Sequence, residues 1–118
     1  MRSLLARVLL IVLAVICVVV GVAGLRGDHR CAQARAALDG PRVAAACGDP
    51  RDRAETAARL AGRGRIAPAR QLARRMVRDS PQDYLGWLAL GRLTGDGHAL
   101  ARAHALNPRG VPTPARPR

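Results

Sequence analysis

Aromatic residues are almost absent from this chain of 118 residues, which has no phenylalanine, one tryptophan and one tyrosine. Beyond residue 25 the β-branched residues are scarce too, and both kinds of residue favour strands. Lysine is missing altogether, so all twenty basic residues are arginine, and alanine is the commonest residue. Because alanine and arginine are strong helix formers, the sequence predicts an all-α protein.

Motifs for catalysis are missing as well. The chain has no Gly-x-Ser-x-Gly, no glycine-rich phosphate loop and no paired carboxylates in an apolar setting, and its only serines are Ser3 and Ser80. No two cysteines have the Cys-x-x-Cys spacing of zinc or haem sites. His29, Cys31 and Cys47 could supply three metal ligands, but nothing nearby completes the set. We therefore expect no enzymatic activity, no cofactor and no metal site.

The charge is strongly one-sided. The net charge is +12, of which +10 lies beyond residue 25, and such a balance attracts nucleic acid, anionic lipid or acidic proteins. Nucleic-acid sites usually combine clustered basic residues with stacking aromatics, whereas these arginines are scattered and Tyr84 and Trp87 stand alone. GC-rich codon usage and attraction to lipid headgroups explain the charge better, so nucleic acid is not an expected partner.

One long hydrophobic run is present, and it lies near the start. The eighteen uncharged residues from Val8 to Leu25 would form a helix about 27 Å long, close to the hydrocarbon thickness of a bilayer. The sequence predicts a basic N-terminus over 1–7 and a transmembrane signal anchor over 8–25, in a single-pass protein of the bacterial cell membrane. A signal peptide cleaved near Ala23 is the alternative, although its apolar stretch is usually only about 7–15 residues long.

Cys31 and Cys47 bear on the orientation of the chain. Between them the sequence predicts a helix to Leu38, a turn at 39–41 and a second helical stretch, so folding at the turn would bring the two cysteines together. We expect a disulfide, with two unpaired buried cysteines as the alternative. Flanking arginines slightly favour a cytoplasmic C-terminal part. Disulfides persist only in oxidising compartments, so we expect the domain to be extracytoplasmic.

Residues 26–48 thus form a predicted helical hairpin cap, and regular helix signals follow over 49–108. Asp49 caps a helix with Pro50 in its first position, and Ser80 caps another with Pro81 in its first turn. The helices are expected at about 50–61, 67–79, 81–94 and 98–106. Two helix pairs, with glycine inside each pair and proline after each, are typical of a helical repeat.

Residues 50–108 resemble the tetratricopeptide repeat family. The matches to its 34-residue pattern share one register: Trp87, Leu90 and Gly91 in one unit, and Gly64, Ala69, Ala73 and Pro81 in the unit before. Thr94 and Arg53 stand where aromatic residues are usual, and Pro108 follows Pro81 by 27 residues rather than 34. A generic set of alanine-rich helical hairpins is the alternative.

The resemblance implies a binding module in which the first helices of each pair line a groove for a protein or peptide. Four residues would point toward that groove: Arg51, Leu85, Leu88 and Arg92. Leu72, Met76, Trp87 and Leu90 would belong to the core. The implied function is a membrane-anchored scaffold that assists envelope assembly or maturation. The alternative is a structural subunit that associates through its transmembrane helix, although Gly21 and Gly24 lack the four-residue spacing of a packing motif.

The chain ends in a segment rich in proline and arginine. Proline prevents helix here, and the charge resists burial. We therefore expect residues 109–118 to be a disordered tail.

Overall fold

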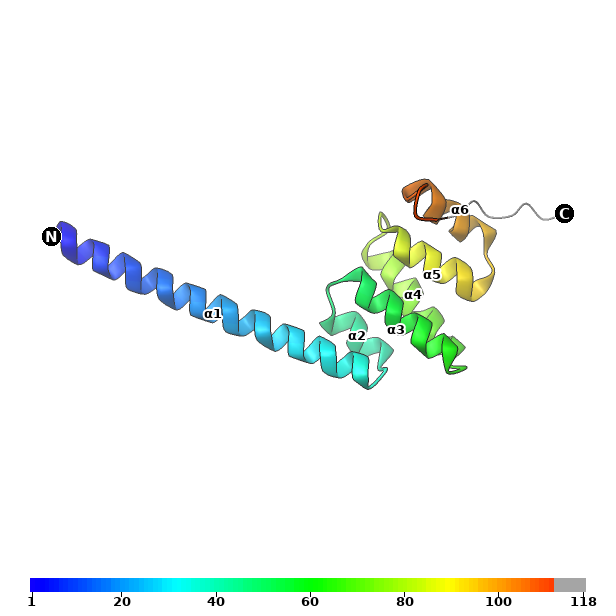
Figure 1. Cartoon of the computed structure of the whole chain (residues 1–118), viewed down its shortest axis with the longest axis horizontal. Coiled ribbons are helices and arrows are strands. Elements are labelled where there is room, and N and C mark those ends of the chain that lie inside the picture. The colour runs from blue at the N-terminus through cyan, green and yellow to red at the C-terminus, as the bar shows by residue number, and fades with distance from the viewer. Residues whose placement is uncertain (112–118) are drawn as a thin grey trace.

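The computed structural model describes residues 1–111. Over that range the chain forms six helices and no strand, so the predicted all-α class is confirmed. Figure 1 shows a long first helix leading into a small bundle of the other five. In chain order the helices are α1 (Arg2–Ala36), α2 (Gly40–Ala46), α3 (Pro50–Gly62), α4 (Ile66–Asp79), α5 (Tyr84–Thr94) and α6 (Gly97–Leu106).

Helix α1 extends far beyond the other helices (Figure 1). The whole molecule, α1 included, measures 79 Å along its longest axis. Helix α1 is long and apolar enough to cross a membrane, and its apolar window has no buried residue. The helix continues without a break past Leu25, and its last turns carry Cys31 and Ala34 into the bundle, where both are buried. The boundary predicted at residue 25 therefore lies within one continuous helix.

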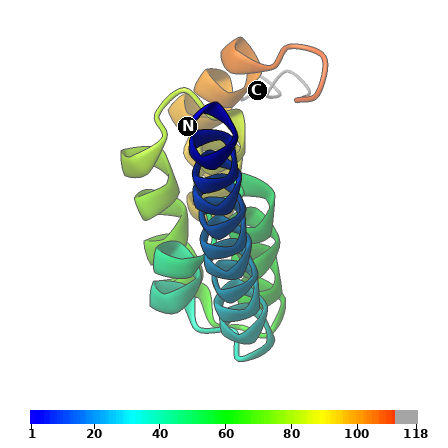
Figure 2. The same ribbon diagram turned by 90° about the vertical axis from the view of Figure 1, so that its left-hand side faces the viewer.

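The bundle consists of three stacked helix pairs. The end of α1 packs on α2, α3 packs on α4, and α5 packs on α6. Successive pairs are joined by the second helix of one pair packing on the first helix of the next, α2 against α3 and α4 against α5. First helices also meet, α3 against α5, and so do second helices, α2 against α4. Viewed at right angles in Figure 2, α1 runs toward the viewer and the other helices lie behind its end.

Four of these helices begin at an aspartate. The side chains of Asp39, Asp49, Asp83 and Asp96 each accept a hydrogen bond from a backbone N–H in the first turn, at 2.8–3.1 Å. An N-cap of this kind satisfies one of the unpaired amides at a helix start. Asp49 followed by Pro50 is the start that the sequence predicts for α3.

The predicted cap of the third repeat helix is wrong. Ser80 ends α4 instead of starting α5: its amide donates to the carbonyl of Met76, and its carbonyl accepts from the amide of Asp83. The residues after it form a turn, and Asp83 is the N-cap of α5. Serine at an N-cap and serine before a proline turn give the same sequence signal, and here the aspartate three residues later takes the capping position.

The core is built from small and aliphatic side chains. Leu60 and Val43 are fully buried, and Thr56 is buried with its hydroxyl donating to the carbonyl of Asp52 at 2.8 Å. Leu72 and Met76 are buried as predicted. The largest contiguous cluster joins the end of α1 to α2, α3 and α4: Cys31, Ala34, Leu38, Val43, Ala44, Cys47, Ala57, Leu60, Ala69 and Leu72.

Trp87 is half-buried, not a core residue, and Leu90 is the same. The buried positions of α5 are two glycines, Gly86 and Gly91. A Cβ at Gly86 would lie 3.2 Å from Met76, and one at Gly91 would lie 2.7 Å from Leu100. Helices α4 and α6 approach the backbone of α5 so closely that large side chains are displaced to the edges of the contact.

The end of α6 is also more ordered than the sequence predicts. Residues 108–110 form a turn, and Val111 is buried with its amide donating to the carbonyl of Asn107 at 3.1 Å. The ring of His104 lies 2.6 Å from the carbonyl of Val111 through Nδ1. The predicted disordered tail therefore does not begin at residue 109, and its remainder, 112–118, lies outside the described residues.

Candidate functional site

A groove of about 410 Å³ lies between α3 and α5. Both helices present one face to it, with residues spaced i, i+3, i+4 and i+7. The face of α3 is alanine at every position, and the face of α5 is mainly leucine. The lining residues are Ala54, Ala57, Ala58 and Ala61 from α3, and Leu85, Leu88, Ala89, Arg92 and Leu93 from α5.

Three of the four residues expected at the groove line it. Leu85 and Leu88 are half-buried at its wall, and Arg92 is exposed at the end of the same face. Arg51 is exposed in the first turn of α3 and lies outside the lining set. The groove is thus apolar along its length and carries one positive charge, that of Arg92 on α5. Leu85 and Leu88 on the same helix remain partly exposed to solvent.

The alanines of α3 matter for what the groove can accept. Because the α3 face has no long side chains, the backbone of a bound segment could approach it closely. The half-buried leucines of α5 could then pack against that segment from the opposite side. Such a surface fits an apolar or amphipathic segment lying along the helices, as in helix-in-groove recognition. Arg92 would favour an acidic group at one end of that segment.

Cys31 and Cys47 form a disulfide, with an S–S distance of 2.07 Å and Cα atoms 4.9 Å apart. It joins α1 to the residue after α2, closing the helical hairpin that the sequence predicts. Arg35, one turn further along α1, pairs with Asp52 at 2.8 Å and with Glu55 at 2.9 Å. Helix α1 is therefore fixed to α3 by these ion pairs and to α2 by a covalent bond.

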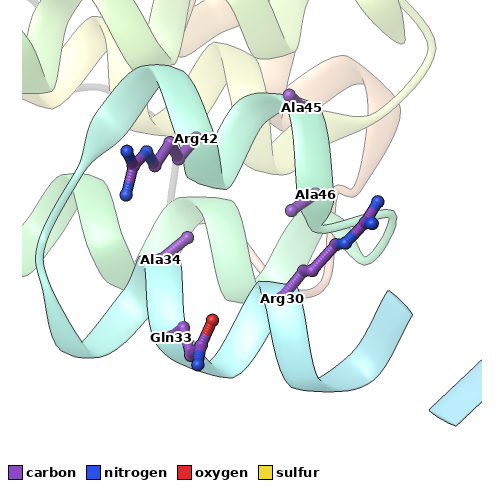
Figure 3. A pocket seen from close by; sticks show the side chains of 6 residues that line it. All are labelled: Arg30, Gln33, Ala34, Arg42, Ala45 and Ala46. Carbon is purple, nitrogen blue, oxygen red and sulfur yellow. The ribbon is translucent and has the colours of Figure 1, made fainter. Parts of the chain in front are cut away.

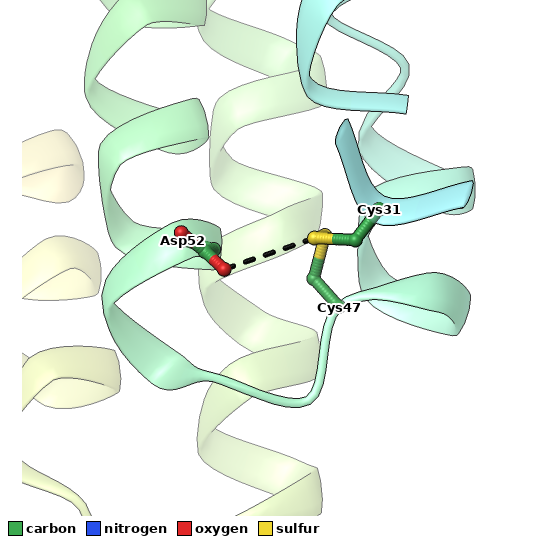
Figure 4. A group of neighbouring side chains, drawn as sticks. All are labelled: Cys31, Cys47 and Asp52. Carbon is green, nitrogen blue, oxygen red and sulfur yellow. Dashed lines mark hydrogen bonds between the residues drawn. A yellow bond between two sulfur atoms is a disulfide. The ribbon is translucent and has the colours of Figure 1, made fainter. Parts of the chain in front are cut away.

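Asp52 also lies beside the disulfide, with Oδ2 3.7 Å from Sγ of Cys31 (Figure 4). A disulfide sulfur carries no proton, so this approach is a contact and not a hydrogen bond. The two sulfurs and the carboxylate lie as close together as the ligands of a metal ion would. Cysteine binds metal as a thiolate, however, and here the two sulfurs are bonded to each other. Neither sulfur is therefore available as a ligand while the disulfide is intact.

One structural residue was not recognised in the sequence. Arg53 is largely buried, and its guanidinium donates to the carbonyls of Cys47 and Ala44, each at 2.7 Å, and to Asp79 at 3.2 Å. It thereby satisfies carbonyls at the C-terminus of α2 and ties α2, α3 and α4 together. The only sequence signal was its place in the repeat pattern, where an aromatic residue is usual.

Comparisons with protein-family models, with curated proteins and with solved structures give no match for this chain.

The lining of the groove is apolar except for the guanidinium of Arg92. A guanidinium carries a positive charge and donates hydrogen bonds. What this set of residues can do is hold an apolar surface and one anionic group.

Proposed function

We propose that the protein is a membrane-anchored scaffold that holds a segment of another protein in the groove between α3 and α5. The observation that carries the proposal is the groove itself: two helices from successive pairs present matched faces, and these faces leave apolar surface uncovered. The resemblance to tetratricopeptide repeats supports it, because first helices line the groove in that family. The protein has no chemistry of its own in this proposal.

The location is part of the proposal. The apolar part of α1 anchors the chain in a bacterial cell membrane, and the domain lies outside the cytoplasm, where the disulfide is stable. A scaffold in that position would assist assembly or maturation of envelope proteins. Its partner would be a protein or peptide with an apolar face and an acidic group that can reach Arg92.

A structural role for α1 is the second candidate. Its apolar residues are exposed along the helix, and nothing lies within 4 Å of a Cβ placed at Gly21 or Gly24. Partner transmembrane helices could cover this surface as lipid does. Replacing 8–25 by an unrelated transmembrane sequence separates the candidates, because a groove scaffold would keep its partner and a structural subunit would lose it.

The anchor predicts how the protein fractionates. The full chain is expected to stay in the membrane pellet after carbonate and high-salt washing, because about eighteen apolar residues cross the hydrocarbon layer. Immunoblotting of the pellet and supernatant measures this. Release of the intact chain would contradict the anchor. A shorter soluble species beginning near Gly24 would show that the segment is a cleaved signal.

The groove predicts a difference between two faces of α5. A photoreactive residue replacing Leu88, which lines the groove, is expected to crosslink a discrete partner in intact membranes. The same residue replacing Leu90 should not, because Leu90 is also partly exposed but lies on the other side of the helix, toward α4. Arg92→Ala should lower the yield at position 88 about tenfold, as expected for a lost charge-assisted hydrogen bond.

The two positions control for each other, since both replace a partly exposed leucine on the same helix. Equal crosslinking at 88 and 90 would mean that the groove is not the binding face. An undiminished yield with Arg92→Ala would remove the acidic group from the description of the partner and leave the apolar groove in place.

A further inference from the structure

A second cleft lies between the last turns of α1 and helix α2, with a volume of about 390 Å³. Figure 3 shows its six lining side chains, with the guanidinium groups of Arg30 and Arg42 at opposite ends and alanines between them. Gln33 adds an amide at the edge. The lining residues are Arg30, Gln33, Ala34, Arg42, Ala45 and Ala46.

The position of this cleft along α1 places it next to the membrane. Because α1 is one unbroken helix, the height of each residue above the apolar stretch follows from a rise of about 1.5 Å per residue. By that rise Arg30 lies about 7.5 Å beyond Leu25. The headgroup layer on each side of the hydrocarbon is about 5–7 Å thick, so a guanidinium on Arg30 can reach lipid phosphates.

Arg42 lies at the end of the cleft farther from the membrane. The disulfide holds Cys47 beside Cys31, so α2 runs back along α1 and its first turn lies level with the end of α1. Arg42 therefore stands above the headgroup layer, where it adds positive potential and has less direct access to a phosphate than Arg30 has.

Both arginines of the cleft have hydrogen-bond donors that can bind an anion. Among the described residues, Arg30 forms no ion pair, and Arg42 has one exposed pair with Asp39 at 3.4 Å. Arg35, which lies on α1 between these two arginines in the sequence, already forms ion pairs with Asp52 and Glu55. The amide nitrogen of Gln33 lies 3.0 Å from the ring of His29. The donors of Arg30 are thus free to bind an anion beside an apolar floor.

We propose that this cleft binds the phosphate of an anionic phospholipid from the leaflet next to the domain. Arginine pairs with phosphate through two parallel hydrogen bonds, and basic pockets at the membrane surface are suited to anionic headgroups. The proposal rests on the anchoring role of α1 in the proposed function, and it is independent of the groove between α3 and α5.

The test uses the full chain in an uncharged detergent with phosphatidylglycerol and phosphatidylcholine of matched acyl chains. Native mass spectrometry counts the lipids that remain bound. The unaltered protein is expected to retain phosphatidylglycerol about tenfold better than phosphatidylcholine. Arg30→Gln should reduce that preference to nearly one, and Arg42→Gln should reduce it about two- to threefold.

Arg63→Gln is the matched control, because Arg63 is exposed at the turn after α3 and lines no part of the cleft. It removes the same charge and should leave the lipid preference unchanged. An equal loss with Arg63→Gln would overturn the proposal, since it would show attraction to net charge alone. Urea titrations monitored by Trp87 fluorescence should give unchanged midpoints, which would establish that each variant is folded.

Adding inorganic phosphate at millimolar concentration tests whether the cleft binds free phosphate rather than a lipid phosphate. Lipid retention should not change, because the acyl chains hold the lipid at the cleft. Displacement of phosphatidylglycerol at that concentration would overturn the lipid assignment in favour of free phosphate. Failure of the anchor is distinguishable from both outcomes, because the chain would then leave the membrane on carbonate washing whichever arginine it carries.

Discussion

Leu60→Ala is expected to lower the free energy of unfolding of the bundle by about 2–5 kcal/mol, the range for a buried leucine that leaves a cavity. Leu60 is fully buried in the cluster that joins α1 to α4. It also reaches α2, since its Cδ1 would lie 3.8 Å from a Cβ at Gly40. A core of this size supplies only about 3–5 kcal/mol, so the variant should be largely unfolded.

The measurement is a urea titration of the full chain in a mild uncharged detergent. Trp87 is the only tryptophan, and its indole N–H donates to the carbonyl of Pro81 at 2.8 Å. Its fluorescence therefore reports on the bundle, while the helicity of α1 in the micelle does not enter the signal.

Ile66→Ala is the control for loss of aliphatic surface. Ile66 is 38% exposed at the start of α4, so its truncation leaves no closed cavity and should change stability by less than about 1 kcal/mol. If Leu60→Ala melts like the unaltered protein, the close packing of α2 against α3 is not what holds the bundle together.

The helices were predictable because their signals are local. Asp49 with Pro50 and the glycines after Ala61 mark the ends of α3 without reference to the rest of the chain. Leu85, Leu88 and Arg92 share one helical face wherever that helix is placed, but the groove itself was implied by the repeat resemblance, which also assigned Arg51 to it. Their position opposite the alanines of α3 depended on the repeat resemblance.

What could not be predicted depends on contacts between distant residues. Nothing near Trp87 in the sequence says that α4 and α6 approach the backbone of α5 at Gly86 and Gly91 and leave the indole half-buried. Arg53 is similar: its value lies in carbonyls at the end of α2 and in Asp79, which is 26 residues away. An arginine-rich sequence gives no means of distinguishing this buried side chain from its exposed neighbours.

Loss of the Cys31–Cys47 disulfide is expected to cost about 3 kcal/mol, the chain-entropy value for a closed loop of about 15 residues. The residues between the two cysteines form the end of α1, a turn and α2, and α2 has only seven residues. A helix of that length has almost no independent stability. Without the cross-link, α2 should detach from α1 and α3, even though the ion pairs of Arg35 still join α1 to α3.

Two comparisons separate the cross-link from the loss of sulfur. Reduced and oxidised forms of the unaltered chain differ only in the bond, and Cys31→Ala with Cys47→Ala removes the sulfurs as well. Both the reduced chain and the double variant should show lower urea midpoints by similar amounts. If reduction has no effect on the midpoint, the hairpin is held by packing and by the polar contacts of Arg35 and Arg53.

The redox state of Cys31 and Cys47 in cells indicates on which side of the membrane the domain lies, because disulfides persist only in oxidising compartments. The chain has three cysteines, and Cys17 is the one left outside the disulfide. In cells treated with a thiol reagent and then denatured without reductant, one cysteine per chain should react. With reductant, three should react. A cytoplasmic domain would instead keep Cys31 and Cys47 reduced, so all three would react from the start. That result would remove the extracytoplasmic orientation and, with it, envelope assembly as the setting for the scaffold.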